Sequence, residues 1–293
     1  MVQTWLPDPN VVGGLAAWTL GIPVVWGLHQ ANLSPGLNGA RTLRMLRWGA
    51  RLSCRIPRRI VCVGEAVRLA HVAAGYDPGP MRVIPLGFDT DLFRPRPNVR
   101  AAVRLSWGVT PENPVIGLVA RYDPHKDIPT FLDAAQIFKN KRPDARFVLC
   151  GAGMERSNAV LLHALGARGL DDMILLGQQE NVQDILPGFD VATLSSVSEG
   201  FPSVLGEAMA CGVLCAATAV GDVVALLGDT GRTVPARDPA VLSEAWGALL
   251  ALSPEERRSR GLAGRDRIEK HFSMGSVAAR YRALYDEALG APR

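Results

Sequence analysis

The stretch VATLSSVSEGFPSVLGEAMACGVLCAATA, Val191–Ala219, places a segment of helical composition between two continuously apolar runs. The runs, 191–196 and 213–219, show no alternation of polar and apolar residues and are short enough to be strands. Continuously apolar strands joined by helices are typical of a parallel sheet that is covered on both faces. The stretch therefore predicts a strand–helix–strand unit of an α/β fold.

The same alternation continues on both sides of this stretch. We predict a strand that opens near Met1 and further strands within residues 22–28, 59–64, 81–87, 114–120, 145–151, 173–177 and 231–235. Helical segments separate them, and the chain is helical after Asp238. For 293 residues, this pattern predicts two α/β domains. We place a partial domain at 1–95, a linker at 96–113, a second domain at 114–265, and a C-terminal helix at 266–293 that returns to the first domain.

The net charge of +4 is modest, but no acidic residue lies between Asp8 and Glu65. That segment contains seven arginines, the first five at helical spacing: Arg41, Arg44, Arg47, Arg51, Arg55, Arg58 and Arg59. One interpretation is a solvated basic face, and the other is contact with an anionic membrane or an acidic acceptor. No nucleic-acid-binding motif accompanies these arginines. Five cysteines without a CxxC pair indicate a cytoplasmic protein, and no apolar run is long enough to span a membrane.

Ligands of open parallel sheets bind beyond the carboxyl ends of the strands, so the polar residues that follow strands are the candidates for a site. Arg121 and Lys126 follow the strand predicted at 114–120 and lie on one loop. A planar guanidinium fork and an ammonium point charge suit a diphosphate. Two solvated loop cations are the alternative interpretation.

Glu199 and Glu207 follow the strand predicted at 191–196 and are eight positions apart. The helix is expected to open at Gly200–Ser203, with Ser203 as its cap, and backbone N–H groups at a helix start favour a phosphate. Glu207 lies among apolar residues, where a carboxylate is costly unless something binds it. The two hydroxyls of a ribose would do so. Two structural glutamates, one favoured by the helix dipole, are the alternative.

Two weaker signals complete the set. Gly151 and Gly153 begin like a dinucleotide-binding fingerprint, but Arg156 stands where the third glycine is required, so NAD is not favoured. These glycines could still let a ligand approach the backbone. His29 follows the strand predicted at 22–28, and a lone loop histidine is more often structural than catalytic. The other histidines show no metal-ligand spacing, so no metal is expected.

Taken in order, these motifs resemble the family-4 group of retaining glycosyltransferases, which have two Rossmann-like domains in the GT-B fold. The most specific part is the glutamate pair, which matches an E-x7-E element. ARYDPHK, Ala120–Lys126, is similar to the family's diphosphate loop with alanine in place of glycine. VIPLGFD, Val83–Asp89, is similar to its domain linker with Leu86 in place of asparagine. The likeness runs from about Val2 to the C-terminal helix.

The resemblance implies a role for each matching residue. Arg121 and Lys126 would neutralise the donor diphosphate, Glu207 would bind the ribose, and His29 would lie near the donor sugar. The remaining donor-binding positions would be Glu199, Gly200, Phe201, Pro202 and Ser203, with Gly151 and Gly153 beside them. The resemblance implies no metal and no cofactor, only a nucleoside diphosphate sugar of UDP or GDP type as co-substrate. Catalysis would rest on His29, Arg121, Lys126 and Glu199.

Family members begin with a strand and a glycine-rich loop for which we find no counterpart, so the first domain is expected to be incomplete. A missed start site, a truncation or a partner subunit would each explain this. Three functions stay open. The first is transfer of a sugar to a glycan or lipid-linked acceptor in bacterial surface polysaccharide synthesis, at the inner face of the membrane. The others are an inactive nucleotide- or partner-binding chain and a nucleotide-sugar epimerase. The E-x7-E and R-x4-K motifs favour transfer.

Overall fold

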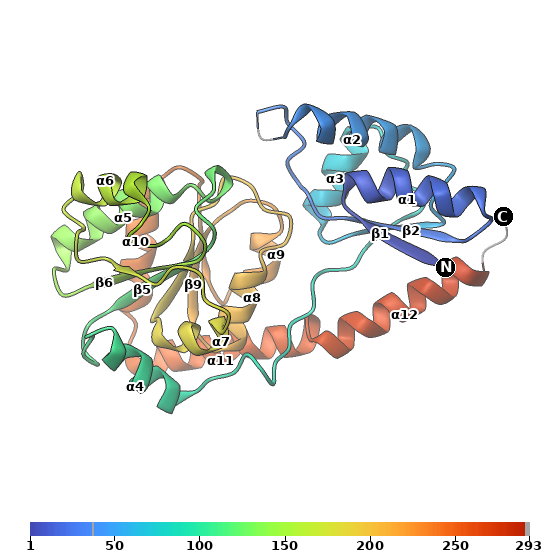
Figure 1. The fold of residues 1–293 in the computed structure, drawn as a ribbon. Helices are drawn as coiled ribbons and strands as arrows, with labels where there is room; N and C mark the ends of the chain where they lie inside the picture. The colour runs from blue at the N-terminus through green and yellow to red at the C-terminus, as the bar shows by residue number, and fades with distance from the viewer. Residues whose placement is uncertain (37, 291–293) are drawn as a thin grey trace. The chain divides into compact units, whose positions relative to one another are not determined.

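A computed structural model describes residues 1–36 and 38–290 and divides the chain into two compact units. The first unit comprises Met1–Gly87, the turn Ser198–Phe201 and the described residues from Phe272 onward. The second comprises Phe88–Val197 and Pro202–His271. Each unit has its own parallel sheet with helices on both faces (Figure 1). The α/β class with two parallel sheets, as predicted from the sequence, is therefore confirmed.

The first unit contains a four-stranded parallel sheet in the order β1-β2-β3-β4. Its strands are β1 (Val2–Trp5), β2 (Val24–Leu28), β3 (Arg59–Cys62) and β4 (Met81–Val83). Helices α1 (Pro7–Thr19), α2 (Ala40–Leu52) and α3 (Glu65–Ala73) lie on one face, and α12 (Met274–Gly290) covers the other (Figure 1). Val277, Leu284 and Ala288 of α12 pack in one buried cluster with Val25 and Val61. The sheet is thus held between two helical layers.

The second unit contains a six-stranded parallel sheet in the order β10-β9-β8-β5-β6-β7. Its strands are β5 (Val115–Val119), β6 (Arg146–Cys150), β7 (Ile174–Leu175), β8 (Val191–Leu194), β9 (Leu214–Thr218) and β10 (Arg232–Val234). If the strands are renumbered 1 to 6 from β5 to β10 and the sheet is read from β7, the order becomes 3-2-1-4-5-6. This is the strand order of dinucleotide-binding folds. The order reverses between β5 and β8, which pair directly. In such sheets, this switch point is where ligands bind.

Eight α-helices and two short 3-10 turns of the described chain surround this sheet. They are α4 (Pro97–Ser106), η1 (Pro124–Lys126), α5 (Ile128–Lys141), α6 (Ala159–Gly166), α7 (Val182–Ile185), η2 (Leu186–Gly188), α8 (Ser203–Ala210), α9 (Val223–Leu227), α10 (Pro239–Leu250) and α11 (Pro254–His271). The ring of Trp246 on α10 lies 5.4 Å from that of Phe131 on α5, inside the main core cluster. Helix α8 packs with α11 on the opposite face of the sheet.

Three expectations from the sequence differ from the structure. Residues 96–113 are not a separate linker, because they carry α4 and belong to the second unit. The segment 266–293 is not one helix: α11 ends at His271 in the second unit, α12 begins at Met274 in the first, and the last three residues of the segment lie outside the described ranges.

The third difference concerns the basic segment 41–59, whose helix α2 ends at Leu52, so that Arg55 falls outside it. Arg58 donates to the carbonyl oxygen of Ala288 at 2.7 Å, and Arg59 pairs with Glu287 at the same distance. Those two arginines therefore hold α12 against the start of β3 within the first unit. No helix within the described ranges is long and apolar enough to cross a membrane.

Candidate functional site

The loop after β5 carries Arg121 and Lys126, the two cations predicted to bind a diphosphate. Arg121 has a side chain that is 76% exposed, with Nη2 3.7 Å from an oxygen of Asp123. Asp123 caps η1 by accepting hydrogen bonds from the backbone N–H and the ring Nδ1 of His125, at 2.9 and 2.8 Å. Burial raises the pKa of Asp123, but the hydrogen bonds from His125 and the charges of His125 and Arg121 together outweigh it, and the pKa is lowered. The loop is thus a capped turn that presents Arg121 to solvent.

The loop after β8 is tied directly to the loop after β5. Ser195 donates its hydroxyl hydrogen to the carbonyl oxygen of Lys126 at 2.8 Å, and the N–H of Val197 donates to the carbonyl oxygen of His125 at 2.8 Å. Ser195 is fully buried and Lys126 is half-buried. Both loops leave the carboxyl ends of the neighbouring strands β5 and β8. The structure therefore brings the cationic loop to the switch point of the sheet.

Helix α8 begins at Ser203, and its N-cap is Pro202, which has no side-chain donor or acceptor. The expectation that Ser203 caps the helix is wrong, because this residue is the first helical residue and is exposed. No side chain caps this helix start in the described chain. The first N–H groups of a helix have no intrahelical partner and form a ready anion site. The start of α8 is therefore open to a ligand.

Glu207 lies in the second turn of α8 and is half-buried. Burial raises the pKa of its carboxyl group above the ordinary value. Among residues 1–36 and 38–290, no cation or hydrogen-bond donor contacts the carboxylate. Its neighbour Gly206 has no room for a side chain because the ring of Phe88 packs against it, which fixes the position of α8. A structural glutamate at this depth would normally be paired.

Gly151 and Gly153 follow β6 and have positive φ angles of +133° and +81°. A Cβ atom at Gly151 would overlap the carbonyl oxygen of Ala120, and one at Gly153 would lie 2.6 Å from Cβ of Tyr122. The N–H of Tyr122 donates to the carbonyl oxygen of Ala152 at 2.8 Å. Both glycines therefore let the loop after β6 pack against the cationic loop. Contact with a ligand stays a prediction for them.

His29 and the turn that carries Glu199 lie together in the first unit. A Cβ atom at Gly200 would overlap the carbonyl oxygen of His29, so this turn packs directly against the backbone after β2. Burial lowers the pKa of His29, and its Nε2 atom is buried without a partner in the described chain. The ring of Phe201 lies 5.6 Å from that of Phe272. Glu199 is half-buried and has interactions of its own.

Two groups of predicted residues thus emerge. Within the second unit, Arg121, Lys126 and the start of α8 lie on loops at the switch point, and Glu207 lies one turn further along α8. His29 and the turn Ser198–Phe201 form the other group, in the first unit.

Sequence reasoning missed the supporting roles of Asp123 and Ser195. An Asp-Pro pair before a short helix and a serine just after a strand were the available signals. In the described chain, no three metal-ligating side chains are grouped to hold a metal.

Comparisons with known proteins match both units. Residues 113–251 match the model described as glycosyl transferases group 1, and residues 1–92 match the model described as Glycosyltransferase Family 4. The D-inositol 3-phosphate glycosyltransferase of Thermobispora bispora is 30% identical over an alignment of 305 positions, which covers 95% of this chain and 68% of that protein. The alpha-maltose-1-phosphate synthase of Mycolicibacterium smegmatis is 28% identical over an alignment of 307 positions, which covers 97% of this chain and 77% of that protein.

A putative glycosyltransferase of Bacillus subtilis, EpsF, is 27% identical over 202 residues, 69% of this chain and about half (52%) of that protein. Among solved structures, Anabaena Alr3699/HepE in complex with UDP-glucose aligns with a TM-score of 0.86 at 21% identity, covering 99% of this chain and 79% of the other. Sucrose-phosphate synthase from Thermosynechococcus elongatus aligns with a TM-score of 0.83 at 22% identity, covering 99% and 74%. These likenesses identify the fold.

Proposed function

Because the chain belongs to glycosyltransferase family 4, with the GT-B fold, we propose that it transfers a sugar from a nucleoside diphosphate sugar to an acceptor. The donor is of UDP or GDP type, and the acceptor is a glycan or a lipid-linked sugar. The anomeric configuration is retained. The setting is synthesis of bacterial surface polysaccharide, at the inner face of the membrane.

The observation that carries this proposal is the half-buried carboxylate of Glu207 next to the switch point of the second sheet, which has no partner in the part of the chain that the structure describes. A carboxylate can accept two hydrogen bonds from vicinal hydroxyls, and the ribose of a nucleotide offers such a pair. The cationic loop with Arg121 and Lys126 supports binding of the diphosphate that follows the ribose. The open N-terminus of α8 adds backbone N–H donors for the same anion.

The leaving diphosphate is stabilised by Arg121, Lys126 and the start of α8, so that charge developing on its oxygen meets preorganised donors. The acceptor hydroxyl attacks the anomeric carbon from the side that the diphosphate leaves. The carbon–oxygen bond to the diphosphate breaks, and the hydroxyl proton passes to a departing phosphate oxygen. Glu199 and the turn Gly200–Phe201 bind the sugar, and His29 lies near it. This mechanism rests on the family likeness.

Support for a uridine donor comes from neighbouring structures, one of which is a complex with UDP-glucose. We therefore expect isothermal titration calorimetry of the full chain to show UDP or GDP binding in the presence of EDTA. No heat with either nucleotide at millimolar concentration would contradict the proposed donor site. If nucleotide binds but none of a panel of UDP- and GDP-sugars is hydrolysed or transferred, the result favours the inactive nucleotide-binding protein that we also considered.

We also propose that the protein contacts an anionic membrane surface peripherally. Arg41, Arg44, Arg47 and Arg51 are exposed on α2, together with Trp48. Helix α1 packs against α2 and exposes apolar side chains of its own: Val12, Leu15 and Trp18. Basic residues combined with exposed aromatic and aliphatic side chains are typical of helices that rest on anionic lipid surfaces.

A further inference from the structure

Helix α8, which carries Glu207 and begins at the proposed phosphate site, is closed at its other end by a Schellman turn. The N–H groups that follow the helix donate to its carbonyl oxygens at 2.9 to 3.1 Å: Cys211 to Glu207, Val213 to Ala208 and Gly212 to Met209. Gly212 has a φ angle of +73°, the left-handed conformation that this turn requires. Of the last four carbonyl oxygens of the helix, the turn leaves that of Ala210 to another donor.

That donor is a side chain of α11. Nη1 of Arg265 donates to the carbonyl oxygen of Ala210 at 2.7 Å and to that of Phe93 at 3.0 Å. Nη2 donates to the carbonyl oxygen of Thr90 at 3.1 Å and pairs with Glu269 at 2.6 Å. The side chain is 19% exposed. A cation at the last carbonyl groups of a helix is also favoured by the helix dipole, so Arg265 stabilises the end of α8 in two ways.

The segment Phe88–Phe93, to which Arg265 ties the end of α8, also contacts the middle of that helix. The carboxylate of Asp89 accepts hydrogen bonds from the N–H groups two and three residues further on, both at 3.0 Å, which fixes the segment as a turn. The ring of Phe88 packs against Gly206, where a side chain would not fit. The segment therefore supports α8 at its middle through Phe88 and at its end through Arg265.

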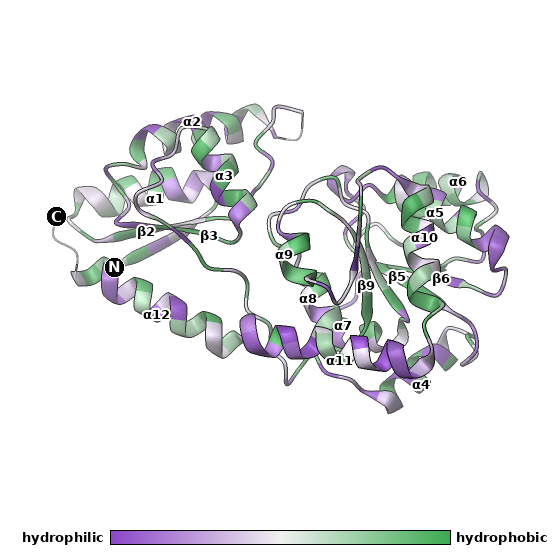
Figure 2. Cartoon of the chain, turned by 180° about the vertical axis from the view of Figure 1, so that it is seen from behind, coloured by the Kyte–Doolittle hydropathy of each residue, from purple (hydrophilic) through white to green (hydrophobic). Residues whose placement is uncertain are grey.

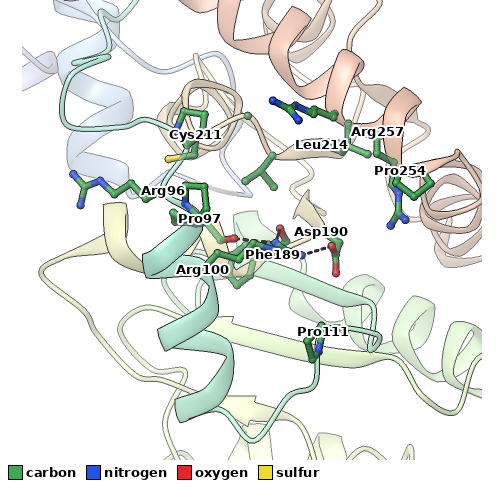
Figure 3. Close-up of a pocket in the computed structure, with 15 residues that line it drawn as sticks. Arg96, Pro97, Arg100, Pro111, Phe189, Asp190, Cys211, Leu214, Pro254 and Arg257 are labelled. Atoms are coloured by element: carbon green, nitrogen blue, oxygen red, sulfur yellow. Dashed lines mark hydrogen bonds and ion pairs between the residues drawn. The ribbon is translucent and has the colours of Figure 1, made fainter.

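Packing of apolar side chains does not by itself fix the end of α8. Gly261 of α11 lies against the backbone of Gly212, because a Cβ atom there would overlap the carbonyl oxygen of Gly212. The same turn borders a cavity of about 500 Å³, which Cys211 and Leu214 line together with the first turns of α11 (Figure 3). Since this cavity leaves part of the turn without packed side chains, the position of α8 depends more strongly on the hydrogen bonds of Arg265.

We propose that Arg265 is a positioning residue for the sugar donor: through α8, it holds Glu207 and the open helix start where the ribose and the diphosphate bind. This inference rests on the proposed function. Binding residues must be held to within about 0.5 Å of their productive geometry by the structure around them. Glu207 lies within one turn of Ala210, so a displacement of the helix end moves the carboxylate as well.

Hydrogen exchange of the ligand-free chain, followed by mass spectrometry, tests whether Arg265 holds α8. Arg265→Gln should speed exchange in peptides from α8 roughly threefold or more, because the helix end opens more often. The matched control is Arg267, which donates to the carbonyl oxygens of Ala225 and Leu226 at the end of α9, at 2.6 and 2.8 Å. Arg267→Gln should speed exchange in α9 and leave α8 unchanged.

Calorimetric titration of UDP, at a temperature where each variant is folded by circular dichroism, tests the positioning role. Arg265→Gln should weaken UDP binding roughly fivefold or more, and Arg267→Gln less than about twofold. In the Glu207→Gln background, Arg265→Gln should weaken binding further by only about twofold, since both substitutions act on one contact. Arg265→Lys keeps the charge and should bind UDP with an affinity between those of the parent and Arg265→Gln.

A purely structural role would lower the melting temperature of Arg265→Gln and leave the UDP affinity of the folded variant unchanged. That result would overturn the proposal, and so would unchanged exchange of α8, additive effects of the Arg265 and Glu207 substitutions, or equal weakening by Arg267→Gln. Should Arg265→Gln fail to fold, Arg265→Lys must still weaken UDP binding about twofold and lose that effect in the Glu207→Gln background. Failure of the donor proposal would instead appear as absent UDP binding by the parent, so the two failures are distinguishable.

Discussion

Burial raises the pKa of Glu207, and its carboxylate has no partner among residues 1–36 and 38–290. Ionising this group therefore destabilises the folded state relative to the unfolded state, in which the carboxylate is fully hydrated. The cost is present above the raised pKa and disappears below the ordinary value of 4.5. We expect Glu207→Gln to raise the melting temperature slightly at pH 7 and to leave it unchanged near pH 3.5. Differential scanning fluorimetry of the ligand-free protein at both pH values measures this.

The same substitution should weaken UDP binding, because a hydrogen bond to a charged group contributes about 1.5–3 kcal/mol, or roughly 10- to 150-fold in Kd. The exposed Glu244 on α10 offers a matched control, and Glu244→Gln should change neither property. A large drop in melting temperature with unchanged nucleotide affinity would show instead that Glu207 is a structural anchor. The parent protein should already bind 2′-deoxy-UDP less tightly than UDP.

Lys126 is predicted to act on the diphosphate and not on the nucleoside. Lys126→Ala should therefore weaken UDP binding by about 1.5–3 kcal/mol and leave uridine binding unchanged. Calorimetric titration of both ligands into the parent and the variant measures the two effects separately. Lys141→Ala, at the exposed end of α5, is the control for loss of a lysine charge. Equal weakening of UDP and uridine would contradict the assigned role.

The candidate residues were found from the sequence because polar side chains after apolar strands are visible there. The residues that surround each candidate in the folded chain could not be found in the same way. The order β8-β5, which places the loop of Arg121 beside that of Ser195, depends on strand pairing and cannot be obtained from local patterns. The cap at Ser203 was predicted wrongly because Pro202, just before it, takes the N-cap position. Whether Glu207 has a partner depends on residues distant in sequence.

At the scale of elements, apolar runs predicted the strands well, because a parallel strand that is buried on both faces is itself a short, continuous run of apolar residues. Element ends were predicted less well. Helix α2 stops at Leu52 although arginines continue at helical spacing to Arg55, and Arg58 and Arg59 bind α12. Contacts with a helix more than two hundred positions away leave no local pattern. The basic surface available to a partner is therefore α2 itself.

Helix α2 provides the prediction at this scale. Hydrophilic and hydrophobic residues alternate along it (Figure 2), and Arg47 is exposed next to Trp48. Arg47→Glu should reduce binding to anionic vesicles roughly 30-fold, since each basic residue near such a surface contributes about 1 kcal/mol and reversing the charge changes the binding free energy by about 2 kcal/mol. Co-sedimentation with phosphatidylglycerol vesicles at low and high salt measures this, and salt should remove the binding.

The matched control for α2 is Arg282→Glu, which reverses an exposed charge on α12 in the same unit. It should leave vesicle binding unchanged. Equal binding of the parent protein to neutral and anionic vesicles would favour a basic face that is merely solvated.

At the scale of the whole molecule, the two units differ in how completely they bury apolar surface. The second unit contains a six-stranded sheet whose central strands are hydrophobic (Figure 2), and Trp246 of α10 is fully buried against Phe131 of α5. The first unit has four strands, and β1 lies at the edge of its sheet. Large apolar side chains of β1, of α1 and of the residues that flank α1 are exposed: Trp5, Leu6, Val12, Leu15, Trp18 and Leu20. Less burial means less stabilisation of the first unit.

We therefore expect scanning calorimetry to resolve two transitions, the first unit unfolding at the lower temperature. The nucleotide and diphosphate contacts proposed for Arg121, Lys126 and Glu207 lie in the second unit, so UDP should shift mainly the upper transition. At about 100 times Kd the ligand contributes about 2.7 kcal/mol, a rise of roughly 5–10 °C. Hydrogen exchange of peptides from β2 and β8, followed by mass spectrometry between the two midpoints, assigns each transition. A single transition that moves as a whole with UDP would show that the units unfold together, and a larger shift of the first unit would place the nucleotide contacts there.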